Sequence, residues 1–271
     1  MNRFKRNKDL IDASQKDYLK SFSPMLTLNS KYNELGLQHF SKGLLLDAGA
    51  GNQRNRPIAV KYCDRYESLD MNADFEGLDH IANLQDMREI PSEHYDTVLM
   101  THVVEHLTRP DVALTEVRRV LKPDGVLIGS TPHLSRLHGV PHDYYRFTNF
   151  GLIYMLRDEA KFNEWAVFPV GGAMSFLGHQ FCTLLVCSTL HIPILGHAIA
   201  RINRHVIVPS ITGLDKVLGV KSWLPFMYMF VATSEVFTQD QRDFLKQMPG
   251  AILSIDDQSS AKITGSAASF D

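Results

Sequence analysis

Cysteine is scarce in this chain of 271 residues: it occurs three times and never as a C-x-x-C pair. The absence of such pairs argues against a disulfide framework and against the common cysteine-based zinc and redox motifs. An excess of one charge is also absent, because 28 lysines and arginines oppose 30 aspartates and glutamates, for a formal net charge of −2. A nearly neutral chain lacks the broad basic surface that binds phosphate backbones, so we expect no nucleic-acid partner.

Long uninterrupted apolar runs are absent as well. Residues 165–200 contain no Asp, Glu, Lys or Arg, but proline, glycine and histidine interrupt them. Because a spanning helix needs about 20 mostly apolar residues, we predict no transmembrane segment. Leu177, Phe181 and Leu184 instead form an apolar stripe at helical spacing. We interpret this stretch as a helical cap on the domain, with peripheral membrane contact through residues 171–200 as the alternative.

The chain begins with a basic stretch that aspartates follow, where a signal peptide would have an apolar segment. We therefore expect no cleavable signal and a cytoplasmic location with reduced cysteines. A membrane-associated state is the alternative that the apolar stripe leaves open. The composition, 44% apolar and 21% charged, is that of an ordinary globular protein.

Short apolar strands alternate with helical stretches from residue 43 onward. Strands are predicted at 44–46, 66–69, 95–100, 126–130, 165–170 and 227–233, and helices at about 110–121 and 149–160. This alternation predicts an α/β fold with a parallel sheet covered on both faces. We divide the chain into an N-terminal helical segment (1–42), a cofactor-binding α/β core (43–170), an apolar helical insertion (171–225), the last strand with the end of the core (226–249) and a disordered tail (250–271).

A glycine turn follows the first predicted strand, in the sequence Leu-Asp-Ala-Gly-Ala-Gly over residues 46–51. Such a turn lets a nucleotide-like cofactor approach the backbone closely. A dinucleotide site needs a small residue three positions after Gly51, but Arg54 occupies that position. Asp47 would repel a pyrophosphate and attract the ammonium and sulfonium groups of S-adenosylmethionine. Asp70, at the end of the next strand, can accept both ribose hydroxyls, so the predicted cofactor is S-adenosylmethionine.

The run from about residue 43 to 132 resembles the class I S-adenosylmethionine-dependent methyltransferases, in particular the methyltransferase type 11 and ubiquinone O-methyltransferase-like group. The stretches that carry the resemblance are LDAGAG, SLDMN, YDTVLMTHVVEHL and EVRRVLKPDGVLIGSTP. The resemblance implies a doubly wound, Rossmann-like sheet of seven strands, with the helical insertion before the last strand.

The same resemblance implies which residues bind the cofactor. Gly49, Ala50 and Gly51 would wrap the methionine part, Asp70 the ribose, and Asn83 with Leu84 the adenine edge; Asp47, Met71 and Thr101 complete the expected set. Two positions depart from the family pattern. Gln53 stands where a third glycine is usual, and Asn83 where an acid is usual, with Asp86 as a substitute acid three residues on.

Histidines follow the strand at 95–100. His102 and His106 bracket Glu105, and the string His-Val-Val-Glu-His matches an inverted zinc-peptidase pattern. We reject that interpretation because the pattern requires a continuous helix, whereas a buried strand ends just before it. His102 and His142, the latter in a loop rich in tyrosine and charge, are the predicted catalytic residues, one of them serving as a base.

A bound metal is an alternative for these histidines. Relatives that methylate the 3′ ends of small RNAs place a metal between an E-x-x-E-H motif and a later histidine, and His102, Glu105, His106 and His142 correspond to that set here. We nevertheless predict no metal ligand. A loop fixed by an Asp143–Arg146 pair is the structural alternative for the residues around His142.

The expected reaction is direct displacement of a methyl group from S-adenosylmethionine onto an oxygen, less readily a nitrogen or carbon. The acceptor would be a small molecule, a glycan or a lipid-linked compound. Two alternatives stay open at this point: a non-catalytic cofactor-binding or scaffold protein of the same fold, and an NAD-dependent dehydrogenase.

Overall fold

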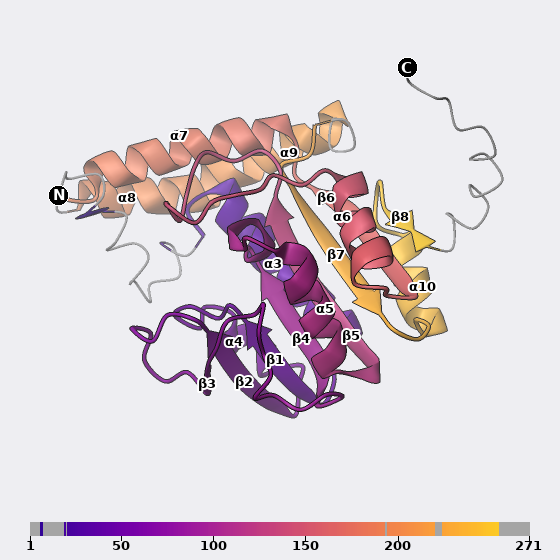
Figure 1. The fold of residues 1–271 in the computed structure, drawn as a ribbon. Coiled ribbons are helices and arrows are strands. Elements are labelled where there is room, and N and C mark those ends of the chain that lie inside the picture. Colours follow the sequence, from indigo (N-terminus) through magenta and orange to yellow (C-terminus); the bar gives the residue numbers. More distant parts are fainter. Residues whose placement is uncertain (1–5, 8–18, 20, 193, 220–223, 255–271) are drawn as a thin grey trace, which may run out of the picture. The chain divides into compact units, whose positions relative to one another are not determined.

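The computed structural model describes residues 6–7, 19, 21–192, 194–219 and 224–254 (Figure 1). Within it the chain forms two compact units, each of which is treated by itself. The smaller comprises residues 1–32, 133–136 and 169–227, and the larger comprises residues 33–132, 137–168 and 228–271.

An eight-stranded sheet forms the centre of the fold. Its strands are β1 (Leu44–Ala48), β2 (Arg65–Asp70), β3 (His80–Ile81), β4 (Tyr95–Thr101), β5 (Leu121–Pro132), β6 (Glu164–Val170), β7 (Met227–Thr233) and β8 (Ile252–Leu253), in the order β3-β2-β1-β4-β5-β7-β6-β8. Strands β1 to β5 pair in parallel. The first seven strands have the class I methyltransferase order, which confirms the predicted fold class, and β8 adds one short antiparallel strand beside β6.

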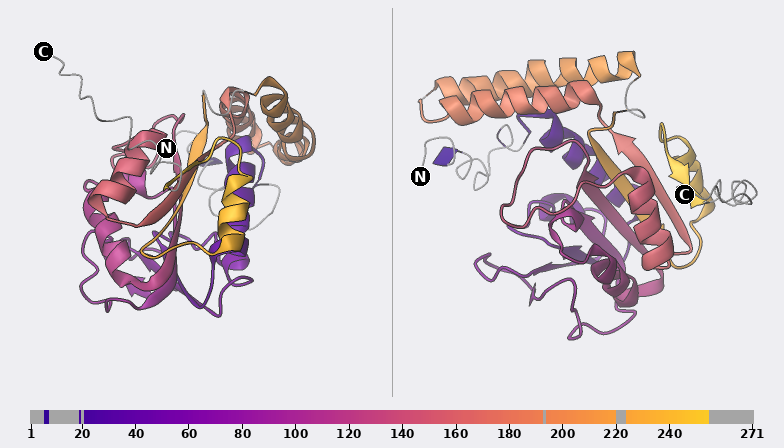
Figure 2. Two further views of the ribbon diagram at one scale, coloured as in Figure 1. Left: turned by 90° about the vertical axis from the view of Figure 1, so that its right-hand side faces the viewer. Right: turned by 45° about the horizontal axis from the view of Figure 1, so that its top comes forward.

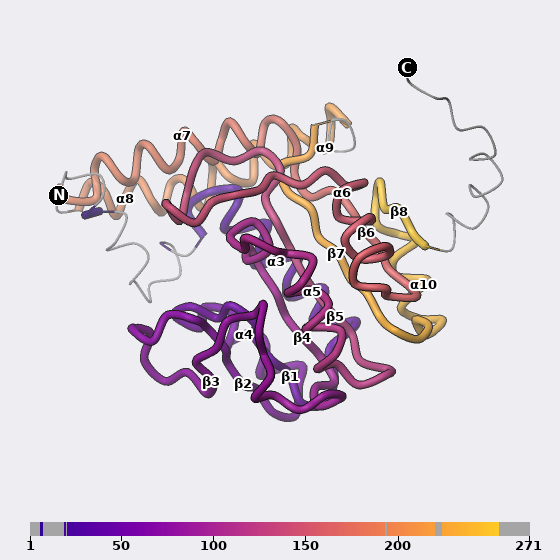
Figure 3. Tube along the Cα trace, in the orientation of Figure 1, coloured from indigo at the N-terminus to yellow at the C-terminus, as the bar shows by residue number. Residues whose placement is uncertain are grey.

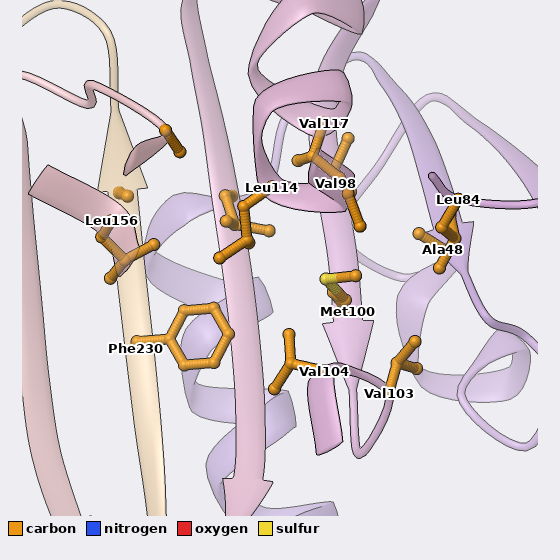
Figure 4. Close-up of a cluster of buried hydrophobic side chains, with 14 of the residues drawn as sticks. Ala48, Leu84, Val98, Met100, Val103, Val104, Leu114, Val117, Leu156 and Phe230 are labelled. Atoms are coloured by element: carbon orange, nitrogen blue, oxygen red, sulfur yellow. The ribbon is translucent and has the colours of Figure 1, made fainter. Parts of the chain in front are cut away.

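Helices cover both faces of this sheet in the larger unit. They are α4 (Arg56–Ala59), α5 (Pro110–Val120), α6 (Asn149–Tyr154) with a π-helical turn η2 (Met155–Glu159), and α10 (Gln239–Lys246); α3 (Pro24–Phe40) enters this unit from the smaller one. Figure 2 shows α5 and α6 on the opposite face from α10. Between α5 and the sheet lies an apolar core that includes Val98, Met100 and Leu114 (Figure 4). This packing fixes the strand ends at which a site can form.

The smaller unit is built on the insertion between β6 and β7. Helix α7 (Ala173–Thr189) packs against α8 (Leu195–Ile202) and α9 (Val208–Leu218), which a π-helical segment η3 (Asn203–Ile207) joins, as the tube in Figure 3 traces. A Cβ atom on Gly178 would lie 2.4 Å from Ile211 Cδ1, so glycine permits the close contact of α7 with α9. No helix in the described part of the chain is long and apolar enough to cross a membrane.

Two sequence predictions need correction. Strand β5 begins at Leu121, earlier than predicted, because residues 122–125 form an irregularity between the pairs Tyr95–Leu121 and Thr97–Val126. The disordered tail was expected from residue 250, but Ile252 pairs with Val167 in β8, so that prediction is wrong for these residues. The rest of the predicted tail, residues 255–271, and most of the first 20 residues of the predicted N-terminal helical segment lie outside the described residues.

Candidate cofactor site

The glycine turn after β1 is held by backbone hydrogen bonds to the end of β2. The amides of Gly49 and Ala50 donate to the carbonyl of Leu69 at 2.8 and 2.9 Å. Gly49 has φ +81°, and a Cβ atom there would lie 2.5 Å from Val103 Cγ2. Only glycine fits this position, because both the dihedral and the space exclude a side chain. The turn therefore offers close backbone approach, although its amides already donate hydrogen bonds within the protein.

Gln53 occupies the place of the usual third glycine, and its backbone shows why glycine is common there. Its φ is +55°, in the left-handed region that side chains disfavour. The Gln53 side chain stabilises this conformation by donating to the carbonyl of Gly77 at 2.8 Å. The departure from the family pattern thus keeps the shape of the turn.

Asp70 links the end of β2 to the glycine turn. Its Oδ2 accepts from the Gly51 amide at 2.9 Å, and its Oδ1 accepts from the Asn72 amide at 2.9 Å. Each carboxylate oxygen has a second lone pair, so the side chain is oriented and can still accept from hydroxyls. This is the geometry that a ribose contact needs.

A cavity of about 490 Å³ opens beside Asp70 at the carboxyl ends of the strands. This is within the size range of small-molecule and cofactor sites. Of the predicted cofactor residues, Gly49, Gly51, Asp70, Met71, Asn83 and Leu84 line it, and both predicted catalytic residues, His102 and His142, line it as well. The sequence analysis missed Phe75, Val103 and Leu107, which supply apolar wall. Phe75 lies outside the motifs, and Val103 and Leu107 lie in a motif that was interpreted only for its polar residues.

Three predicted cofactor residues, Asp47, Ala50 and Thr101, do not line this cavity. Asp47 is 1% exposed, and its Oδ2 accepts from the Tyr66 hydroxyl at 2.8 Å. Burial raises the pKa of Asp47 to about 6, against the opposing effect of hydrogen bonds from Tyr66 and Asn55. Thr101 accepts a hydrogen bond from Asn55 at 2.9 Å. Asp47 is thus buried against Tyr66 and does not line this cavity, and its contact with the cofactor stays a prediction.

Asn83 is the predicted polar residue at the adenine end of the site. The Oδ1 atom of Asn83 accepts from the Gln85 amide at 2.9 Å, and the Asn83 side chain lies at the cavity wall. Asp86, the substitute acid, pairs with Arg88 at 2.7 Å and does not line this cavity. Because its carboxylate pairs with Arg88 outside this cavity, the structure gives no support to its expected role as a replacement.

His102 lies at the cavity edge directly after β4. Its φ of +53° is unusual for a residue with a side chain, and such backbone strain is often found at functional sites. Its Nδ1 lies 3.5 Å from Glu105 Oε1. Its Nε2 is buried and has no hydrogen-bond partner among the residues that the structure describes.

Glu105 is a fully buried carboxylate surrounded by histidines. Its Oε2 accepts from the Thr131 hydroxyl at 3.1 Å, whereas Oε1 lies 3.7 Å from His106 Nε2 and 3.6 Å from His138 Nε2. Burial by itself would raise the pKa of Glu105, but the neighbouring histidines, led by His102, bring it down to about 2. His138 was missed by the sequence analysis because it is distant in sequence from the His-Val-Val-Glu-His string.

The loop after β5 carries His142 to the cavity. The amides of Tyr144 and Tyr145 donate to the carbonyl of Glu105 at 2.9 and 3.2 Å, which fastens the loop to the segment after β4. The Nδ1 atom of His142 lies 3.0 Å from the Tyr144 hydroxyl. The predicted pair of Asp143 with Arg146 is confirmed, at 2.7 Å. That pair lowers the pKa of Asp143 to about 2.

The comparison with known families decides the identity of the domain. Residues 46–129, which contain the glycine turn, Asp70 and the histidine string, match the model of the methyltransferase type 11 family. The chain contains an S-adenosylmethionine-dependent methyltransferase domain of type 11. The match favours this activity over the dehydrogenase and scaffold alternatives, and the cofactor is S-adenosylmethionine, as predicted.

Solved structures of other proteins share the fold. A SAM-dependent methyltransferase from Archaeoglobus fulgidus is 17% identical, with 78% of this chain and 94% of that one covered and a TM-score of 0.50. The [4+2]-cyclase SpnF is 15% identical over 77% and 82% of the chains, with a TM-score of 0.51. A phosphoethanolamine N-methyltransferase 2 from Haemonchus contortus, in complex with phosphomonomethylethanolamine and S-adenosylhomocysteine, is 11% identical over 76% and 53%, with a TM-score of 0.51.

At these identities the likeness concerns the fold alone, and the cyclase illustrates that one fold serves different reactions. No curated protein matches the sequence. The methyltransferase acts on some acceptor, whose chemistry must be argued from the site.

Proposed function

We propose that this methyltransferase transfers the methyl group to an oxygen of a small-molecule, glycan or lipid-linked acceptor. The observation that carries the proposal is the exposed His142, which lines the cavity beside the Tyr144 hydroxyl. An alcohol is a weak nucleophile until its proton is removed, so an oxygen acceptor calls for a base at this place. Nitrogen and carbon acceptors are the less favoured alternatives.

The proposed step is a single displacement. The acceptor oxygen attacks the methyl carbon, the bond from that carbon to sulfur breaks, and its electron pair stays on sulfur as S-adenosylhomocysteine forms. The hydroxyl proton passes to an imidazole. The chain's part is to align the two reactants and receive that proton, since the sulfonium already activates the methyl group.

His142 is a better candidate for this base than His102, although both stay proposed catalytic residues. When His142 Nδ1 donates to the Tyr144 hydroxyl, its Nε2 has a lone pair that can accept a proton. The Nδ1 atom of His102 faces Glu105, and its Nε2 is enclosed. His102 therefore contributes its ring to the cavity wall, and His142 is suited to exchange a proton with solvent.

The test uses S-adenosylmethionine with a deuterated methyl group, incubated with separate lipid and polar extracts and wild-type protein. Mass spectrometry should find a labelled product with the label on oxygen. His142→Ala should lower the rate by about 10²-fold or more while S-adenosylhomocysteine affinity changes little. Label on nitrogen or carbon, or an unchanged rate in His142→Ala, would contradict the proposal.

We further propose that the acceptor is amphipathic and that the helical insertion binds an anionic membrane surface. Binding to the membrane is how a cytoplasmic protein would reach a lipid-linked substrate. Leu177, Phe181 and Leu184 share one face of α7 and are 56%, 52% and 58% exposed. Exposed apolar residues also lie on α8 and α9, among them Leu195 and Val217. Such a face on helices that do not span is typical of proteins that lie on a membrane.

Charge on the insertion supports an anionic lipid as the occupant. Its cations include Arg201, Arg204 and Lys216, and its carboxylate, Asp215, is fully buried. Asp215 accepts from the amides of Gly172 and Ser175 at 2.9 and 2.8 Å, so it caps the start of α7 and contributes no exposed negative charge. Basic residues beside apolar ones add electrostatic attraction to anionic headgroups.

Vesicle co-sedimentation tests this part. Wild-type protein should bind vesicles of phosphatidylglycerol and phosphatidylcholine, more weakly at high salt, and bind pure phosphatidylcholine less. The triple change Leu177→Gln, Phe181→Gln and Leu184→Gln should abolish binding. Phe150→Gln, at an exposed aromatic of the larger unit, is the matched control and should have no effect. No binding of wild-type protein to either vesicle would refute the membrane proposal and leave the methyl-transfer proposal intact.

A further inference from the structure

Three side chains of the larger unit converge on one small volume beside the cofactor cavity. Glu105, His106 and His138 each bring one donor atom, and these atoms all lie within 4.8 Å of one another. Glu105 Oε1 is 3.7 Å from His106 Nε2 and 3.6 Å from His138 Nε2. A tetrahedral metal ion with bonds of about 2.0–2.2 Å holds its ligand atoms roughly 3.3–3.6 Å apart. The two distances from Glu105 Oε1 are close to that value.

The buried carboxylate oxygen is the strongest sign that something belongs between these atoms. Glu105 is fully buried, and its Oε1 has no hydrogen-bond partner among the described residues. Distances of 3.5 to 3.7 Å to imidazole nitrogens are too long for good hydrogen bonds. A buried carboxylate oxygen without a donor is costly, and a cation removes that cost.

The orientation of the His106 ring also indicates a cation at this place. Its Nδ1 lies 2.5 Å from the carbonyl oxygen of His142. A carbonyl only accepts, so Nδ1 carries the hydrogen. When the ring is neutral, the lone pair of Nε2 is turned toward Glu105. A lone pair facing a carboxylate oxygen is repulsive unless a cation lies between them. A second ring nitrogen tied to a carbonyl is also the usual support of a metal-binding histidine.

The other ring is held at its Nδ1 atom. His138 Nδ1 lies 3.5 Å from Asp143 Oδ2, which accepts, and 3.4 Å from Arg146 Nη2, which donates. With the hydrogen on Nδ1, facing Asp143, the lone pair of Nε2 is directed toward Glu105. The loop can close over His106 only because residue 139 is glycine: its φ is +63°, and a Cβ atom would lie 2.8 Å from His106 Cε1. Both rings are thus fixed by their surroundings with Nε2 toward Glu105.

We propose that Glu105, His106 and His138 bind a divalent transition-metal ion of the zinc class. One carboxylate with two imidazoles is a donor set for zinc and iron(II), whereas calcium and magnesium prefer oxygen alone. Three protein ligands leave positions open, and His106 lines the cofactor cavity, so an acceptor oxygen can bind the ion there. This last role rests on the proposed methyl transfer to oxygen; ion binding itself does not.

The proposed site departs from the sequence analysis in two ways. No metal ligand was predicted, and the set considered as an alternative contained His102 and His142. In the structure His142 supports His106 through its carbonyl, and His138 supplies the imidazole instead. His102 Nδ1, 3.5 Å from the same oxygen of Glu105, borders the site without belonging to the group of three.

Metal binding is tested on the full chain after removal of bound ions with a chelator. Titration with Zn²⁺ should show about one ion per chain, and Co²⁺ should give the visible absorption of a low-coordinate site. His138→Ala and Glu105→Gln should weaken Zn²⁺ binding by more than the roughly 10- to 100-fold typical of lost supporting groups, and Asp143→Asn by about that amount. His205→Ala, an exposed histidine of the smaller unit, is the matched control and should bind as wild type does.

Folding is checked in the same samples. Zn²⁺ should raise the melting temperature of wild type and of His205→Ala, and leave that of His138→Ala unchanged. Wild-type protein that binds no Zn²⁺, or His138→Ala that folds and binds it equally well, would overturn the proposal, as would tighter binding of Mg²⁺ or Ca²⁺. Because these readouts need no acceptor, their failure is distinct from failure of the methyl-transfer proposal.

Discussion

The cofactor cavity and the helical insertion differ in where their charged side chains lie. In the cavity, the carboxylate of Asp70 lies at the end of β2 and is oriented by the backbone amide of Gly51. In the insertion, Asp215 is buried as a helix cap, and the exposed surface is apolar with scattered cations. We therefore expect substitutions in the cavity to alter both ligand binding and stability. Substitutions on the surface of the insertion should alter only its association with membranes.

Substitutions of two glycines, one in each region, should show the largest difference in stability. Gly49→Ala should lower the free energy of unfolding by about 4 kcal/mol, because φ is +81° and the added Cβ would lie 2.5 Å from Val103. Gly213→Ala meets no atom within 4 Å in helix α9 and should raise it by about 0.5–1 kcal/mol. Urea denaturation measures both. Equal effects of the two changes would contradict the close packing assigned to the glycine turn.

Because the pKa of Asp47 is raised in the folded state, we expect the free energy of unfolding to depend on pH, by about 2 to 3 kcal/mol. Burial raises the pKa of Asp47 from 3.8 to about 6, so the folded state binds its proton more tightly than the unfolded state does. The free energy of unfolding contributed by this group should therefore fall as pH rises from about 4 to 6 and stay constant above. Asp47→Asn should remove this dependence and be more stable than wild type at pH 7. Urea denaturation of both proteins at several pH values measures this difference. Identical pH profiles of wild type and Asp47→Asn would refute the raised pKa of Asp47.

The smallest effect on stability is expected from the insertion. Leu177→Gln should change the free energy of unfolding by no more than about 0.5 kcal/mol, since the side chain is more than half exposed. S-adenosylhomocysteine affinity should also be unchanged. Thermal denaturation and calorimetric titration measure the two quantities. A large loss of stability would mean that this residue supports the core rather than a surface.

The sequence predicted the features that lie within short contiguous motifs. The strands, the glycine turn and Asp70 follow from local patterns, and the structure brings six of the nine predicted cofactor residues to one cavity. It could not predict that Asp47 faces Tyr66 rather than the cavity, because that depends on packing between strands. His138 was missed because the loop returns to Glu105 only in three dimensions, through hydrogen bonds from Tyr144 and its neighbour.

Calorimetric titration with S-adenosylhomocysteine tests the central claim most directly, since Asp70 links the glycine turn, the cavity and the cofactor. Wild-type protein should bind one molecule per chain, and Asp70→Ala should weaken binding by about 100-fold or more, because hydrogen bonds to a charged group contribute about 1.5–3 kcal/mol each. Asp86→Ala, at the acid outside this cavity, should bind as wild type does. No binding by wild-type protein, or equal affinity in Asp70→Ala, would contradict the account of the site.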